Sequence, residues 1–117
     1  MYEYRAFVRK VYDGDTITVD FDLGFGITLS GQKVRLLGIN TPEVRGPERP
    51  SGLVSRDALR NKIGNKWVTI KTHKDRRGKY GRWLAEVFIE VEGSSANINE
   101  WLLAEGLAVK YEKKKKK

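Results

Sequence analysis

Short runs of alternating apolar and polar residues, separated by glycine-bearing turns, most constrain what this 117-residue chain can fold into. The segment 16–21 alternates strictly, and in the segment 83–91 apolar residues at every second position alternate with Glu86 and Glu90. Alternation with a period of two places one face of a strand in the core and the other in water. Further strands are predicted over 4–11, 33–39 and 67–72, with an alternating run at 27–30, a kink or bulge at Gly31-Gln32, and turns at 13–15, 24–26, 75–78 and 93–95.

Two helices are predicted between and after these strands. The first follows a loop, 40–52, that holds all three prolines and has no apolar period. Ser51 is expected to cap this helix over 52–63, with Gly64 as its stop and an i, i+4 face that pairs Val54 with Ala58 and Leu59 with Ile63. Asn97, with Glu100 three residues later, predicts a second N-cap, and Gly106 ends that helix.

The element order is therefore β-β-β-α-β-β-α, a mainly β chain with helices. Five short strands with a helix between the third and the fourth are typical of a five-stranded OB-fold barrel. We expect one such domain over residues 1–112, followed by a disordered lysine tail over 113–117.

The composition is that of an ordinary soluble protein with a basic balance. Apolar residues make up 39% and charged residues 32%, which is too polar for a membrane span. The net charge of +8 suggests a polyanionic partner, but the five lysines of the tail leave only +3 for the rest. Two interpretations of the tail stay open: a solubilising or cloning-derived end, which we favour slightly, or a non-specific nucleic-acid grip.

Several classes of chemistry are excluded by what the sequence lacks. There is no cysteine, which excludes disulfides and thiolate chemistry, and the single His73 is too little for a Ser-His-Asp triad or a poly-histidine metal site. No long apolar stretch opens the chain, so we expect a cytoplasmic protein, or a secreted one if a leader has been removed.

Charged residues and turn formers stand together where the predicted strands end. They form four clusters: Asp13-Gly14-Asp15-Thr16, Arg35, Asn40-Thr41-Pro42-Glu43 and Lys79-Tyr80-Gly81-Arg82. Strand ends of a small rigid barrel can present acids and arginines to a common ligand. Two carboxylates and two guanidiniums meeting at one place would suit a metal ion and a phosphodiester.

The residue types are compatible with that chemistry. Asp15, the amide of Asn40 and the carbonyl of Thr41, whose direction Pro42 restricts, are hard oxygen donors suited to Ca²⁺ or Mg²⁺. Glu43, in the same loop, is a candidate for activating a water. Taken singly, these motifs are common turns, and an arginine on a strand is ordinarily an exposed cation. Only the combination carries a functional hypothesis.

This combination, together with Asn99-Glu100 and Gly106-Leu107-Ala108 near the end, resembles the staphylococcal-nuclease-like (thermonuclease) family, in order from about Val8 to Lys110. The resemblance implies a five-stranded OB barrel with packed helices. It also implies a metal site with Asp15, Asn40 and Thr41, catalytic roles for Glu43, Arg35 and Arg82, and substrate contacts for Lys79, Tyr80 and Tyr111.

The chain departs from the family's type member at informative positions. Asn40 stands where the type member has a second metal-binding aspartate, so the metal affinity should be lower. Gly78 replaces an acidic residue often found ahead of Lys-Tyr-Gly-Arg, and the lysine tail stands where the type member continues into another helix.

By this resemblance the chain is expected to hydrolyse DNA and RNA, preferably single-stranded, with little sequence specificity and to leave 3′-phosphate ends. Ca²⁺ is the expected cofactor, with Mg²⁺ or Mn²⁺ as alternatives, and a monomer without membrane contact is the expected state. Two rival interpretations are a catalytically weak or inactive OB-fold module that binds nucleic acid or protein, and a barrel that binds small nucleotides.

Overall fold

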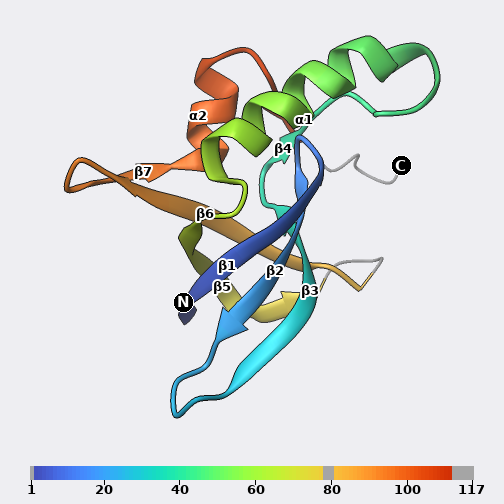
Figure 1. Cartoon of the computed structure of the whole chain (residues 1–117). Helices are drawn as coiled ribbons and strands as arrows, with labels where there is room; N and C mark the ends of the chain where they lie inside the picture. The colour runs from blue at the N-terminus through green and yellow to red at the C-terminus, as the bar shows by residue number, and fades with distance from the viewer. Residues whose placement is uncertain (1, 78–80, 112–117) are drawn as a thin grey trace, which may run out of the picture.

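Six strands form one sheet, five of which close into a ring (Figure 1). The computed structural model describes residues 2–77 and 81–111. Neighbouring strands are antiparallel in the order β3-β2-β1-β5-β6-β7, and a parallel pairing of β3 with β6 closes the ring. The strands are β1 (Tyr2–Asp13), β2 (Thr16–Asp22), β3 (Thr28–Leu36), β5 (Trp67–Arg77), β6 (Trp83–Val91) and β7 (Ser94–Asn97).

Two helices and a small second sheet complete the fold. The helices are α1 (Arg49–Ile63), preceded by the single turn η1 (Gly46–Glu48), and α2 (Ile98–Ala104). The second sheet pairs β4 (Ile39–Asn40) with β8 (Val109–Lys110). The predicted mainly β fold of OB type with two helices is confirmed. None of the helices in residues 2–77 and 81–111 is long and apolar enough to cross a membrane.

Local predictions succeeded where backbone chemistry decides the structure. Asn97 caps α2, and its side chain accepts a hydrogen bond from the Glu100 N–H. The predicted irregularity at Gly31 is present, because β3 places one extra residue opposite Asp20. Gly31 has a φ of +66°, which glycine adopts easily, and its N–H donates to the Asp20 carboxylate.

Other local predictions were wrong. The helix α1 begins at Arg49, so Ser51 lies inside it and does not cap it, and Val54 is 61% exposed. The predicted turn over 75–78 is replaced up to Arg77 by a longer β5, while Gly78 lies outside the described residues. Residues 94–95 begin strand β7 instead of a loop. In the last two cases, pairing between strands extended segments whose local composition favours turns.

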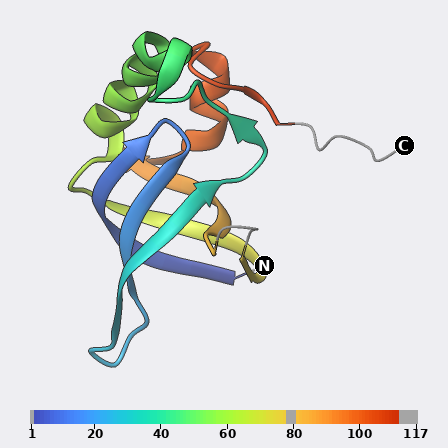
Figure 2. The same ribbon diagram turned by 90° about the vertical axis from the view of Figure 1, so that its right-hand side faces the viewer.

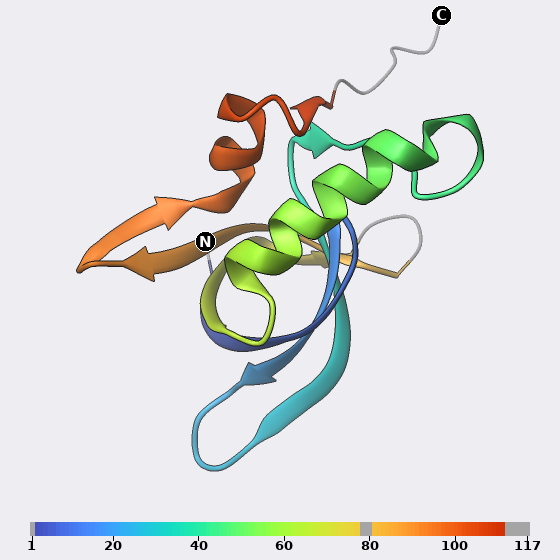
Figure 3. The ribbon, with the colours of Figure 1, turned by 45° about the horizontal axis from the view of Figure 1, so that its top comes forward.

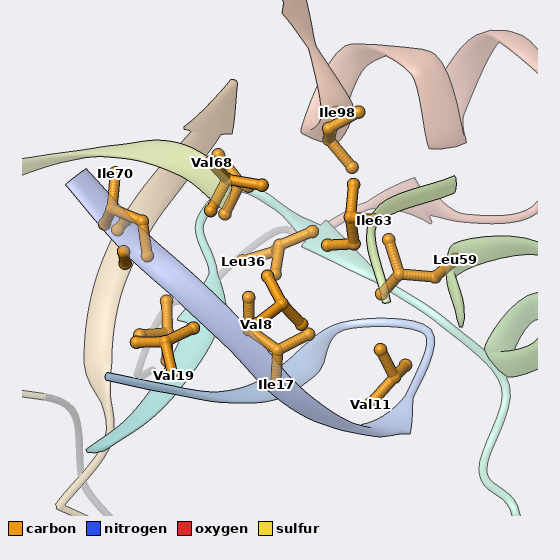
Figure 4. Packing of buried hydrophobic residues seen from close by; sticks show 14 of the residues in the cluster. Val8, Val11, Ile17, Val19, Leu36, Leu59, Ile63, Val68, Ile70 and Ile98 are labelled. Carbon is orange, nitrogen blue, oxygen red and sulfur yellow. The ribbon is translucent and has the colours of Figure 1, made fainter. Parts of the chain in front are cut away.

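The core fills the ring and extends to the two helices (Figure 4). Val8, Ile17 and Leu36 point inward from three strands, and Leu59 and Ile63 reach them from α1. All five side chains are fully buried, and each such aliphatic side chain contributes about 1.5–3 kcal/mol.

The two ends of the ring differ in what they carry. Figure 2 shows both helices gathered at one end, while the hairpin formed by β2 and β3 projects at the other. Figure 3 shows α1 lying across the first of these ends, beside the turn that joins β1 to β2. The chemistry-bearing residues of the sequence gather at this helix end.

Candidate active site

The turn between β1 and β2 is packed tightly against the loop after β4. Gly14 lies at this contact, and a Cβ built there would stand 2.7 Å from Cγ2 of Thr41 and 2.9 Å from Cβ of Ser55. Real Cβ atoms do not come that close to their neighbours, so only glycine fits. The close approach brings Asp15 next to Thr41.

Asp15 is buried and makes three polar contacts. Its Oδ2 accepts the Thr41 N–H at 3.0 Å and lies 3.1 Å from Nη1 of Arg35. Its Oδ1 accepts the hydroxyl of Thr16 at 3.2 Å. A carboxylate fixed by partners from three segments is pre-oriented for binding.

Asp13 places a second carboxylate beside the first. Its Oδ1 accepts the N–H of Asp15 at 3.0 Å. Burial, reinforced by the neighbouring Asp15 side chain, raises the pKa of Asp13 to about 7. Two buried carboxyl groups this close to each other form an electronegative spot.

Arg35 lies between the candidate cation ligands and the ring of Tyr111. Besides its contact with Asp15, its Nη2 donates to Oδ1 of Asn40 at 3.4 Å, and its Nη1 donates to the carbonyl of Leu36 at 3.3 Å. The guanidinium carbon lies 5.7 Å from the ring centroid of Tyr111, a cation–π distance. The structure thus places Tyr111 next to Arg35, although 75 residues separate them in the chain.

The C-terminal segment supports the loop that carries Asn40 and Thr41. The pairing of β4 with β8 sets Asn40 opposite Val109, and the Ser55 hydroxyl of α1 donates to the carbonyl of Leu107 at 2.7 Å. Behind the loop, buried Asn99 donates to the carbonyls of Leu37 and Ala85 and accepts the N–H of Val87. The Asn-Glu and Gly-Leu-Ala motifs therefore act as structural supports of the site.

Glu43 lies on a loop that packs against the N-terminal part of α1. Its N–H donates to Oε1 of Glu48 at 3.2 Å, and its side chain is exposed. Directly underneath, a Cβ built at Gly52 would lie 2.1 Å from the carbonyl oxygen of Glu43. The absence of a side chain at Gly52 therefore fixes how close the helix comes to the loop.

Arg82 reaches the same place from the start of β6. Its Nη1 donates to Oγ1 of Thr16 at 3.2 Å, one residue from Asp15. Lys79 and Tyr80, also predicted from the sequence to contact substrate, lie outside the described residues.

These side chains line one open hollow of about 770 Å³, which we call the site hollow. It brings together the sequence-predicted residues Asp15, Arg35, Asn40, Thr41, Glu43 and Arg82. The other side chains that line it are Lys10, Tyr12, Asp13, Thr16, Thr18, Lys33 and Arg45. Asp13 and Thr16 belong to a cluster singled out in the sequence, whereas the other five were not predicted. The register of β1, β2 and β3 brings Lys10, Thr18 and Lys33 side by side.

The oxygen donors that line the site hollow are of the type that binds a hard divalent cation, and the affinity expected of them is modest. All candidate donors are oxygens, from Asp15, Asn40, Thr41 and neighbouring Asp13. The Thr41 Oγ1 is buried and has no hydrogen-bond partner, although buried polar atoms normally have one. Within the described part of the chain, however, no three acidic or histidine side chains cluster as metal ligands would. A ligand set with few charges should bind a cation weakly.

The chain combines a strand ring of OB type with a site of acids and arginines at the helix end of that ring. Comparison with known proteins identifies the family to which a chain of this kind belongs. The family model described as "Staphylococcal nuclease homologue" matches residues 33–117. The chain is 36% identical to "Thermonuclease" of Staphylococcus hyicus over 104 residues, which cover 86% of this chain and 56% of that protein. It is 39% identical over 105 residues to "Endonuclease YncB" of Bacillus subtilis (strain 168), covering 85% of this chain and 44% of that protein.

A third relative is "SPbeta prophage-derived endonuclease YokF" of the same strain, 39% identical over 103 residues, which cover 85% of this chain and 31% of that protein. The chain belongs to the family of staphylococcal nuclease homologues. It spans about half the length of the thermonuclease that it matches.

Proposed function

We propose that this chain is a metal-dependent nuclease that hydrolyses phosphodiester bonds of DNA and RNA. The observation that carries the proposal is the site hollow, in which Glu43, Arg35 and Arg82 from three separate segments face the Asp15 side of a candidate cation site. Relatives named thermonuclease and endonuclease support it.

The roles of the residues follow from their chemistry. Glu43 is an exposed carboxylate on the rim of the hollow, where it can take a proton from an attacking water. The new bond joins that water oxygen to phosphorus, the bond from phosphorus to the 5′-oxygen breaks, and the leaving 5′-oxygen takes up a proton from solvent. The products are a 3′-phosphate and a 5′-hydroxyl.

Arg35 and Arg82 would bind the phosphate oxygens as negative charge builds up on them. A guanidinium donates two parallel hydrogen bonds in a fixed plane, which a lysine cannot do. Arg35 is already oriented by Asp15 and by the Tyr111 ring, and Arg82 by Thr16. Preorganised donors of this kind are each worth roughly 10²–10³ in rate.

Asp15, Asn40 and Thr41 would hold the divalent cation, with Ca²⁺ preferred over Mg²⁺ and Mn²⁺. When bound, such a cation polarises a phosphoryl oxygen and balances the charge of the two aspartates. The buried Thr41 Oγ1, which has no hydrogen-bond partner, supports this role.

The proposed substrate is single-stranded nucleic acid, read with little base specificity by a monomer. Tyr111 is 55% exposed beside Arg35, and stacking on an exposed ring accepts any base. Lys79 and Tyr80, adjacent in the chain to Arg82, are proposed as further contacts.

A second candidate is a non-catalytic nucleic-acid-binding module. Two observations favour it: Asn40 supplies no charge to the cation site, and Arg35 already pairs with Asp15. Both would weaken metal binding compared with a site of two free carboxylates.

Digestion of single-stranded DNA and of RNA, with each of Ca²⁺, Mg²⁺ and Mn²⁺ and with a chelator, separates the two candidates. The nuclease should cleave both polymers with a divalent cation and stop when the chelator is added. Its products should accept a 5′-phosphate label only where a free 5′-hydroxyl has formed. Intact polymers under every condition, with binding retained, would establish the non-catalytic module instead.

A further inference from the structure

Three neighbouring strands each contribute one side chain to a row beside Arg35, one of the proposed catalytic arginines. Lys10 of β1 pairs with Thr18 of β2, and Thr18 pairs with Lys33 of β3. All three side chains line the site hollow, so they share its face of the sheet. The two lysines are exposed and Thr18 is half-buried. We call this the lysine row.

The lysine row stands one step along the strands from the catalytic row. The neighbouring row pairs Thr16 with Arg35. Thr16 lies two residues before Thr18 in β2, and Arg35 lies two residues after Lys33 in β3. Two residues of a strand span about 6.6 Å, and two strand spacings place the lysine backbones about 10 Å apart. The step between rows is comparable to the distance between successive phosphates of an extended single strand.

The charge of the lysine row differs from that of an ordinary solvated face. Neither Lys10 nor Lys33 makes an ion pair in the described part of the chain. The next carboxylate along β2, that of Asp20, already pairs with Arg9 and accepts the Gly31 N–H. The hollow also holds Asp13, Asp15 and Glu43, but neither lysine forms an ion pair with any of them in the described part of the chain, so no direct ion pair neutralises the charge of the row.

We propose that the lysine row holds the phosphate next to the scissile one, so that the substrate is an internal stretch of single-stranded nucleic acid and not a terminal nucleotide. This inference rests on the proposed nuclease function of the same hollow. Lysine suits the task, because a flexible point charge attracts a phosphate without fixing its orientation, whereas the arginines orient the reacting one.

Binding measured without cleavage tests the lysine row directly. Glu43→Gln in the presence of chelator serves as the parent, and labelled oligothymidylates of two and of about ten nucleotides are titrated at several salt concentrations. Each lysine that contacts a phosphate contributes about 0.7 to the slope of log K against log salt, so Lys10→Gln with Lys33→Gln should lower it by about 1.4. At about 0.1 M salt the longer oligonucleotide should bind roughly 25-fold more weakly, and the dinucleotide should lose less.

Lys62→Gln with Lys66→Gln is the matched control, because it removes the same two positive charges and neither lysine lines the hollow. A slope and affinity in the double variant that match those of this control would overturn the proposal, and so would an equal loss for both lengths. A parent that binds no oligonucleotide would overturn it as well. If binding depends on the row but the wild type cleaves nothing, the nuclease function fails while the lysine row stands as a binding site.

Discussion

The strands β2 and β3 end differently at the two ends of the ring. At the helix end, Asp15 and Thr16 are buried, and the Leu36 N–H donates to the carbonyl of Asp15 at 2.9 Å. At the far end, the tip of the same hairpin exposes Phe25 completely and Ile27 by 56%. One hairpin therefore has buried polar residues at one end and exposed apolar residues at the other.

The difference lies in how many partners fix each end. At the helix end, a Cβ built at Gly14 would lie within 3 Å of the side chains of Thr41 and Ser55, so a larger residue there must displace buried side chains. At the tip, the turn is closed by backbone hydrogen bonds between Leu23 and Ile27 and between Ile27 and Gly24. We infer that substitutions at the helix end change both stability and chemistry, while the tip tolerates them.

The largest expected effect on stability is at Gly52. A methyl group there meets the carbonyls of Glu43 and Pro42, and backbone atoms cannot move aside as a flexible side chain would. Although alanine is the better helix former by about 1 kcal/mol, we expect Gly52→Ala to lose about 1–3 kcal/mol of stability in urea unfolding. Ser51→Ala, at an exposed position of the same helix, is the control. Equal stability of the two variants would show that the loop is not held by this contact.

The next effect concerns the cation. Asn40→Asp adds a negative charge beside the other candidate cation ligands. Asn40 lies close to Asp15, because Arg35 contacts both side chains. We expect Ca²⁺ to bind roughly ten-fold more tightly, because the affinity for a hard cation rises with the number of charged ligands. Calorimetric titration of both proteins, with nucleotide present, measures this. Equal or weaker binding would remove Asn40 from the site and leave Asp13 and Asp15 as its donors.

A smaller effect, with a defined pH dependence, is expected midway along the hairpin. The N–H of Gly31 and then the Arg9 side chain hold the pKa of Asp20 below 3.8. Because the folded pKa is lowered, the stabilisation is present above pH 3.8 and is lost as the pH falls through the folded value. Asp20→Asn keeps an oxygen for Gly31 but loses the charge. Its deficit in melting temperature should be seen at pH 7 and shrink in strong acid, and a deficit independent of pH would refute this.

The smallest effect is expected at the tip. Phe25 is fully exposed and has a φ of +54°, which asparagine tolerates better than phenylalanine. Phe25→Asn should change the free energy of unfolding by less than about 0.5 kcal/mol and leave cleavage unaffected. A loss above about 1 kcal/mol would mean that the two ends are not as different as the structure indicates.

Much of the fold could be predicted from the sequence because alternation and turn chemistry are local signals. Thr16 to Phe21 alternates in sequence, and it forms β2. The expected wet face of this strand was wrong, because five of these six residues are buried and Thr18 is half-buried. Asn97 caps the helix it was expected to cap. The start of α1 and the end of β5 were mispredicted because pairing and packing over long distances decide them.

The site residues likewise divide into those that the sequence could predict and those that it could not. The acids and arginines could be selected from the sequence because they stand in turn motifs at strand ends. The lysine row, Tyr12 and Arg45 could not, because contacts between distant segments set their neighbours. Strand register aligns Lys10, Thr18 and Lys33, and the loop after β4 brings the Arg45 Nη2 to 3.4 Å from the Tyr12 hydroxyl across 33 residues. Gly52 was also missed as a support of Glu43, since a glycine in a helix carries no signal of what lies above it.

The rate of single-stranded DNA cleavage by Glu43→Gln, measured with Ca²⁺ beside the wild type, tests most directly whether the helix end is a hydrolytic site. Glu105→Gln, an exposed position at the end of α2, is the matched control. A general base contributes roughly 10²–10⁴-fold, so the Glu43 variant should lose that much turnover while its affinity for DNA stays within a few-fold. Turnover within a few-fold of the wild type would contradict the account and remove Glu43 from the reaction.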